Sequence, residues 1–139
     1  MSQRIESAFL FVKHKVQINA LRSFGIDYLM KAVYRLFRWL MEVDFQDKQG
    51  LGLVETDRAA ETKLSVSLIN SLRDKLVVIR AAPDERTLRN WKSLHYEKMK
   101  GRGEERSIRL NKQWRLIFTV DTSVSPNRMT IIAVEDPHY

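Results

Sequence analysis

The sequence contains no cysteine, only three histidines, and few glycines and prolines among its 139 residues. The absence of cysteine excludes a disulfide scaffold, a thiolate zinc site and a cysteine nucleophile, and it fits a reducing compartment such as the cytoplasm. Three histidines without an HExxH pair predict no metal site and no cofactor. No run of about 18 apolar residues is present, so we expect no stable membrane insertion.

Acidic residues are outnumbered, which gives a net charge of +7 and a pI near 9.9. The excess is uneven: residues 1–40 carry seven basic and two acidic side chains, whereas residues 41–139 carry a net +2. Such an excess favours a polyanionic partner, namely nucleic acid, a ribosome surface or anionic lipid. The alternative is a basic globular protein without a polyanionic partner.

The sequence predicts a basic N-terminal helical extension over residues 1–40 and one globular domain over residues 41–139. An amphipathic helix is expected over residues 26–40, where apolar residues recur at steps of three and four. Its stripe consists of Ile26, Leu29, Met30, Val33, Phe37 and Leu40. This helix packs on the domain, lies on a membrane or partner surface, or precedes an ancestral start at Met41.

The second segment predicts an α+β domain. Alternation of apolar and acidic residues over 41–45 indicates a strand. A leucine stripe then indicates a helix over 58–82, which Thr56 or Asp57 caps and Pro83 ends. One further helical turn is expected over 84–90. The period then becomes two, which predicts strands over 94–100, 107–110, 114–120 and 129–135. Because short turns separate these strands, we expect a small antiparallel sheet with helices on one face.

The turn between the second and third of these later strands fixes which side chains share a face. A three-residue turn over 111–113 pairs Arg109 with Arg115 and leaves Ile108 and Leu116 on the apolar face. A two-residue turn would mix the faces, so burial favours the first register. Two adjacent guanidinium groups repel unless an anion or a carboxylate joins them, and their planar fork matches phosphate oxygens.

Residues 94–139 resemble the HigB-type branch of the RelE/ParE toxin superfamily. The resemblance lies in Lys100-Gly101, in the run SIRLNKQWRLIF over 107–118, and in the ending Glu135-Asp136-Pro137-His138. It implies the toxin of a type II toxin–antitoxin pair that cleaves mRNA in the ribosomal A site. It also implies a HigA-like helix-turn-helix antitoxin as the partner. The toxin would contact operator DNA only through this antitoxin.

The resemblance supplies the candidate catalytic residues. They are Lys100, Arg109, Arg115, Asp136 and His138. A metal-independent ribonuclease uses the 2′-hydroxyl of its substrate as nucleophile and needs cations for the phosphate and groups that transfer protons. The arginines and Lys100 would hold the phosphate, and His138, oriented by Asp136, would carry a proton.

Four further residues are assigned to RNA binding beside these. They are His95, Lys98, Arg102 and Tyr139. The chain departs from the family pattern at two positions: Pro137 replaces a tyrosine of the usual ending, and Glu97 stands where many members have histidine. The alternative functions are a non-catalytic or gyrase-inhibiting ParE-like binding module, and a basic interaction protein that docks through residues 26–40.

Overall fold

The computed structural model describes residues 39–137. The predicted helix over 26–40, the extension and the residues His138 and Tyr139 therefore lie wholly or mostly outside the described residues. Residues 41–139 form one compact unit. None of the described helices is both long and apolar enough to cross a membrane.

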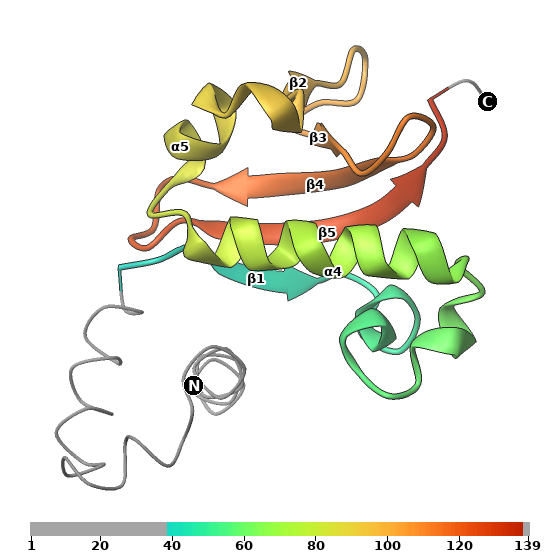
Figure 1. Ribbon diagram of the computed structural model, residues 1–139. Coiled ribbons are helices and arrows are strands. Elements are labelled where there is room, and N and C mark those ends of the chain that lie inside the picture. The colour runs from blue at the N-terminus through green and yellow to red at the C-terminus, as the bar shows by residue number, and fades with distance from the viewer. Residues whose placement is uncertain (1–38, 138–139) are drawn as a thin grey trace, which may run out of the picture. The chain divides into compact units, whose positions relative to one another are not determined.

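The domain has a single five-stranded sheet with the strand order β1-β5-β4-β3-β2 (Figure 1). The strands are β1 (Glu42–Phe45), β2 (Glu97–Lys98), β3 (Arg106–Arg109), β4 (Arg115–Asp121) and β5 (Arg128–Glu135). The pairs from β2 to β5 are antiparallel, as expected, but β1 pairs with β5 in parallel. The α+β class is thus confirmed, and the sheet is mixed rather than purely antiparallel because the helical segment after β1 carries the chain across the sheet.

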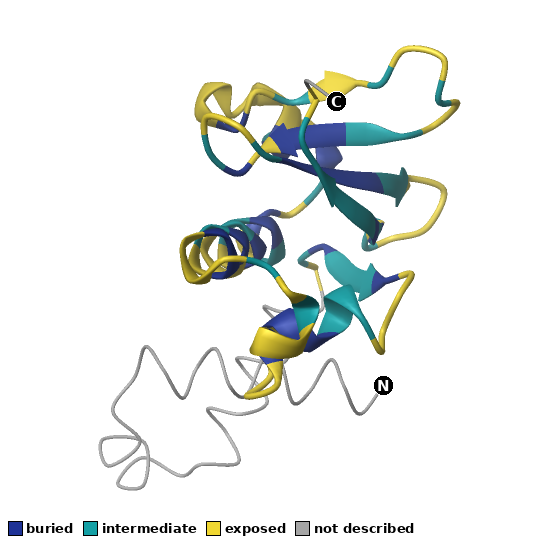
Figure 2. Cartoon of the chain, turned by 90° about the vertical axis from the view of Figure 1, so that its right-hand side faces the viewer, coloured by how far each residue is buried: buried dark blue, intermediate teal, exposed yellow. Residues whose placement is uncertain are grey.

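Helix α4 (Val66–Ala81) lies across one face of the sheet (Figure 1). The stripe predicted from the sequence is Leu64, Leu68, Leu72, Leu76 and Ile79. The buried residues of α4 are Leu68, Ile69, Leu72, Leu76 and Ile79, so four of the five predicted residues are buried in the helix. They pack against inward residues of the sheet such as Ile108, Leu116, Phe118 and Ile131. Figure 2 shows the same division, with the side of α4 that faces the sheet buried and its outer side exposed.

The predicted start of this helix at residue 58 is wrong. Two short 3-10 helices, η1 (Leu51–Glu55) and η2 (Ala59–Thr62), precede it. Lys63 then adopts the left-handed region at φ 61°, which ends the helical run. The hydroxyl of Ser65 accepts a hydrogen bond from the amide of Leu68 at 3.2 Å, so Ser65 is the N-cap in place of Thr56 or Asp57.

The segment between α4 and β3 supports the edge of the sheet. It comprises helix α5 (Glu85–Asn90), the 3-10 helix η3 (Lys92–Leu94) and the two-residue strand β2. Asp84 caps α5 through the amide of Thr87 at 2.9 Å. The strand predicted over 94–100 is therefore much shorter, because buried Leu94 anchors a helical turn and His95 takes a left-handed conformation at φ 47°.

Candidate functional site

The β3–β4 hairpin has the predicted register. Arg109 lies opposite Arg115, and the amide of Leu110 donates to the carbonyl of Trp114 at 2.9 Å. The side chain of Asn111 closes the turn, since its Oδ1 accepts from the amides of Gln113 and Trp114 at 2.9 and 2.8 Å. Both arginines consequently stand on the face of the sheet that α4 does not cover.

Arg115 is held from within the protein. Its Nε donates to the hydroxyl of Ser107 at 2.9 Å, and its Nη2 donates to the carbonyl of His95 at 2.5 Å and lies 3.6 Å from a carboxylate oxygen of Glu97. Burial lowers the pKa of Arg115, the charge of Glu97 acts in the opposite sense, and nearby Arg109 lowers it further. The guanidinium is therefore fixed in place, and only Nη1 has no hydrogen-bond partner among the described residues.

Arg109 has the opposite environment. Its side chain is exposed, and it forms no ion pair or side-chain hydrogen bond with any residue of the range 39–137. The buried Arg115 guanidinium beside it adds positive potential to the same surface. The hairpin thus presents one open and one fixed guanidinium, an arrangement suited to binding an anion such as phosphate.

Arg102 is engaged by carboxylates. Its Nη1 and Nη2 donate to the two oxygens of Glu135 at 2.6 and 3.0 Å, and its Nε lies 2.6 Å from Glu105. The hydrogen bonds with Glu135 raise the pKa of Arg102 and lower that of Glu135. These contacts, which we call the Arg102 clamp, tie the β2–β3 turn to β5. The register of β4 and β5 places Glu135 opposite Arg115. The RNA-binding role expected of Arg102 stays a prediction, and in the structure its guanidinium serves the clamp.

The two lysines of this region are exposed. Lys98 pairs in register with Arg106, and Lys100 lies in the turn that follows, next to Gly101 at φ 70°. Because β3 runs from Arg106 to Arg109, this turn meets β3 at the end opposite to Arg109. The turn nevertheless reaches toward the arginine pair, because Arg102, two residues after Lys100, binds Glu135, which lies opposite Arg115 in the sheet. The catalytic role of Lys100 stays a prediction.

Asp136 lies beside the hairpin turn. The Nε2 of Gln113 donates to its Oδ2 at 2.8 Å, which draws the segment after β5 to the β3–β4 turn. Asp136 is thus held at the hairpin turn, near the strand ends that carry Arg109 and Arg115, and its catalytic role stays a prediction. His138 and Tyr139 follow within three residues but lie outside the described residues.

Ser107 and Glu97 were not among the predicted site residues, although both contact Arg115. Ser107 is fully buried on the open side of the sheet and is the only polar residue of the four-residue strand without a charge. Because side chains alternate between the two faces of a strand, Ser107 could have been predicted to lie on the same face as Arg109 and Arg115. Glu97 could have been found by its register, because it lies opposite Ser107 in the sheet.

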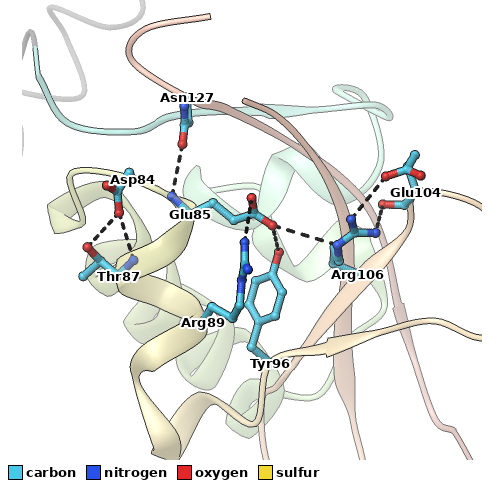
Figure 3. Close-up of polar contacts among 8 residues, drawn as sticks. All are labelled: Asp84, Glu85, Thr87, Arg89, Tyr96, Glu104, Arg106 and Asn127. Atoms are coloured by element: carbon cyan, nitrogen blue, oxygen red, sulfur yellow. Dashed lines mark hydrogen bonds and ion pairs between the residues drawn. The ribbon is translucent and has the colours of Figure 1, made fainter. Parts of the chain in front are cut away.

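A second polar cluster was also missed, and it joins α5 to the sheet. The phenol of Tyr96 donates to Glu85 at 2.5 Å, Arg106 lies 3.9 Å from the same oxygen, and Arg89 lies 3.4 Å from the other. Figure 3 shows these side chains converging on Glu85. Burial, followed by the hydrogen bond with Glu85, raises the pKa of Tyr96. The cluster holds the segment that carries His95, and thereby the carbonyl that receives Arg115.

Comparison with known families identifies the class of protein. The model of a family described as the RelE-like toxin HigB of type II toxin–antitoxin systems matches residues 43–131. The chain belongs to this HigB-like toxin family. The match extends from β1 into β5, so it includes the arginine pair and stops before Asp136. A toxin of this class has an antitoxin partner.

Among solved structures, the chain is similar to a YoeB/ParE toxin from Agrobacterium tumefaciens. The sequence identity is 16%, the TM-score is 0.44, and the alignment covers 71% of this chain and all of that one. No curated protein sequence gives a significant match.

Proposed function

We propose that this toxin is a ribosome-dependent mRNA endonuclease that stops translation and growth. The observation that carries the proposal is the exposed Arg109 opposite the fixed Arg115, in a hairpin whose turn also binds Asp136. Phosphoryl transfer needs such positioned cations more than it needs covalent chemistry from the protein. A HigA-like helix-turn-helix antitoxin in the cytoplasm would restrain the toxin, and operator DNA would be contacted only through that antitoxin.

The reaction proceeds through the 2′-hydroxyl of the RNA. Its oxygen forms a bond to the adjacent phosphorus while the bond from phosphorus to the 5′-oxygen breaks, which leaves a 2′,3′-cyclic phosphate and a 5′-hydroxyl. Arg109 binds the phosphate oxygens, and Arg115 stabilises the charge that develops on them. Lys100 contributes further positive potential from the β2–β3 turn.

Two proton transfers accompany this exchange of bonds. The exposed carboxylate of Glu97, beside Arg115, is placed to accept the proton of the 2′-hydroxyl. His138 is the expected donor to the leaving 5′-oxygen, with Asp136 as its positioning residue. Each transfer by a positioned group contributes about 10²- to 10⁴-fold to the rate.

The test compares Arg109→Ala with wild type by primer extension on ribosome-bound mRNA after induction of the full chain. We expect cleavage to fall about 100-fold, the usual effect of removing one transition-state donor, while circular dichroism stays native. Arg58→Ala removes an exposed arginine from the segment before η2 and is the matched control.

Wild-type cleavage by the Arg109→Ala variant would contradict the site. A gyrase supercoiling assay on the same preparations tests the alternative of a ParE-like binding module. Gyrase inhibition by the wild-type chain without mRNA cleavage would replace the endonuclease proposal with that alternative.

A further inference from the structure

Trp91, which the proposed reaction does not use, is exposed in the segment that leads to His95, whose carbonyl holds Arg115. It lies between α5 and η3, and 45% of its surface is accessible. The backbone beneath it is firmly held: its amide donates to the carbonyl of Leu88 at 3.2 Å, and its carbonyl accepts from the amide of Leu94 at 3.0 Å. Leu88 and Leu94 are both buried, so the indole is presented by a rigid base.

The charges around this ring are almost all positive. Over the range 86–98 the exposed charged side chains are one acidic, Glu97, and four basic. The basic ones are Arg86, Arg89, Lys92 and Lys98. Glu85 of the same helix is buried and occupied by Tyr96 and Arg89. An exposed aromatic ring within a basic surface combines a stacking platform with phosphate attraction.

This segment is linked to the arginine pair through His95. His95 directly follows η3, and its amide donates to the carbonyl of Lys92 at 3.2 Å. The carbonyl of His95 in turn receives Nη2 of Arg115. A strand bound at Arg109 and Arg115 would therefore meet Lys92 and Trp91 as it leaves the site.

We infer that Trp91 and Lys92, together the Trp91 surface, bind single-stranded RNA next to the scissile phosphate by stacking a base on Trp91. The choice of RNA as the ligand rests on the proposed function. The inference adds the surface that would bind the RNA beyond the scissile phosphate. A protein partner fits less well, since protein interfaces have an apolar core and are depleted of lysine. The other exposed large hydrophobic residues of the described range lie elsewhere: Trp39, Val66, Val77 and Val124.

The test measures binding of the full chain to a fluorescein-labelled single-stranded oligoribonucleotide, methylated at its 2′-hydroxyls so that it is not cleaved. Trp91→Ala should raise Kd by about 5- to 100-fold, the usual effect of losing one stacked base, and Trp91→Phe should restore most of the affinity. Lys92→Ala should lower the slope of log Kd against log salt by about 0.7. Trp39→Ala and Lys75→Ala are the matched controls.

Unchanged Kd in Trp91→Ala, or no binding by the wild-type chain, would overturn the inference. So would a weaker complex of Trp91→Ala with the antitoxin at unchanged RNA affinity, which would assign the surface to a protein. The two proposals fail separately. If Trp91→Ala loses RNA affinity but the wild-type chain does not cleave mRNA, the Trp91 surface is supported and the endonuclease proposal is not. If the wild-type chain cleaves mRNA but Trp91→Ala binds RNA with unchanged affinity, only the Trp91 surface is contradicted.

Discussion

Arg109 and Arg115 occupy equivalent positions in the hairpin but have different environments. Arg115 is almost fully removed from water, and removing a guanidinium from water is tolerated only where hydrogen bonds and a carboxylate compensate. Ser107, Glu97 and the carbonyl of His95 provide that compensation. Arg109 has no such partner among the described residues, so it can donate its whole fork to a ligand. In the proposed reaction, Arg115 is therefore the fixed cation of the pair and Arg109 is the one that binds the phosphate.

Glu135 gives a prediction about pH. Its bond with Arg102 holds its pKa below the usual value near 4.5, so it stabilises the fold above that pH and loses this contribution as pH falls through its lowered pKa. Glu135→Gln should therefore reduce the free energy of unfolding at pH 7 by about 0.5–1 kcal/mol, given that the pair is partly exposed. Urea denaturation measures this difference, which should vanish in strong acid.

The control for this measurement is Asp74→Asn on α4. Asp74 is exposed and forms no ion pair with the residues that the structure describes. Its replacement should leave the pH dependence of unfolding unchanged. An equal loss of unfolding free energy in both variants would contradict the stabilising contact between Glu135 and Arg102. So would a difference between Glu135→Gln and wild type that increases as the pH falls.

At the scale of secondary structure, the start of α4 depends on one hydroxyl. Ser65 accepts the amide of Leu68, and Ser65→Ala should lower the free energy of unfolding by about 1 kcal/mol, as is typical for loss of an N-cap. Ser67→Ala, two positions into the same helix and exposed, should change it by less than about 0.5 kcal/mol. Equal effects of the two substitutions in urea denaturation would contradict the capping role.

The sequence predicted elements well where periodicity and burial agree. The leucine stripe, Pro83 and the alternation after residue 106 located α4, its end and the strands β3 to β5. The start of α4 was missed because Leu64 continues the apolar stripe, while the left-handed turn at Lys63 has no glycine to mark it. The shortness of β2 was missed for a similar reason, since the left-handed residue there is His95.

The candidate site was predictable only in part. The hairpin register followed from which face is apolar, and it brought Arg109 and Arg115 together. Which of the two would be buried depends on Ser107 and on the path of the chain at His95, and neither is encoded in a local pattern. The Glu85–Tyr96–Arg106 cluster joins residues from α5 and the sheet edge, so only the three-dimensional packing reveals it.

At the scale of the whole molecule, we propose that residues 41–139 fold as an independent domain. Among the residues that the structure describes, the members of the buried core lie between Met41 and Ile131. The fragment 41–139 should unfold in one cooperative transition, with near-ultraviolet circular dichroism showing fixed aromatic side chains. A fragment that shows secondary structure without such a transition would contradict the division at residue 40.

The parallel pairing of β1 with β5 has a consequence for biosynthesis. Glu42 finds its partner Arg128 only 86 positions later, and contacts between such distant segments form late because a long loop must close first. Glu135, which clamps Arg102, also belongs to β5. A ribosome that is making this chain therefore carries a nascent domain without a fully assembled proposed site until β5 has emerged from its exit tunnel.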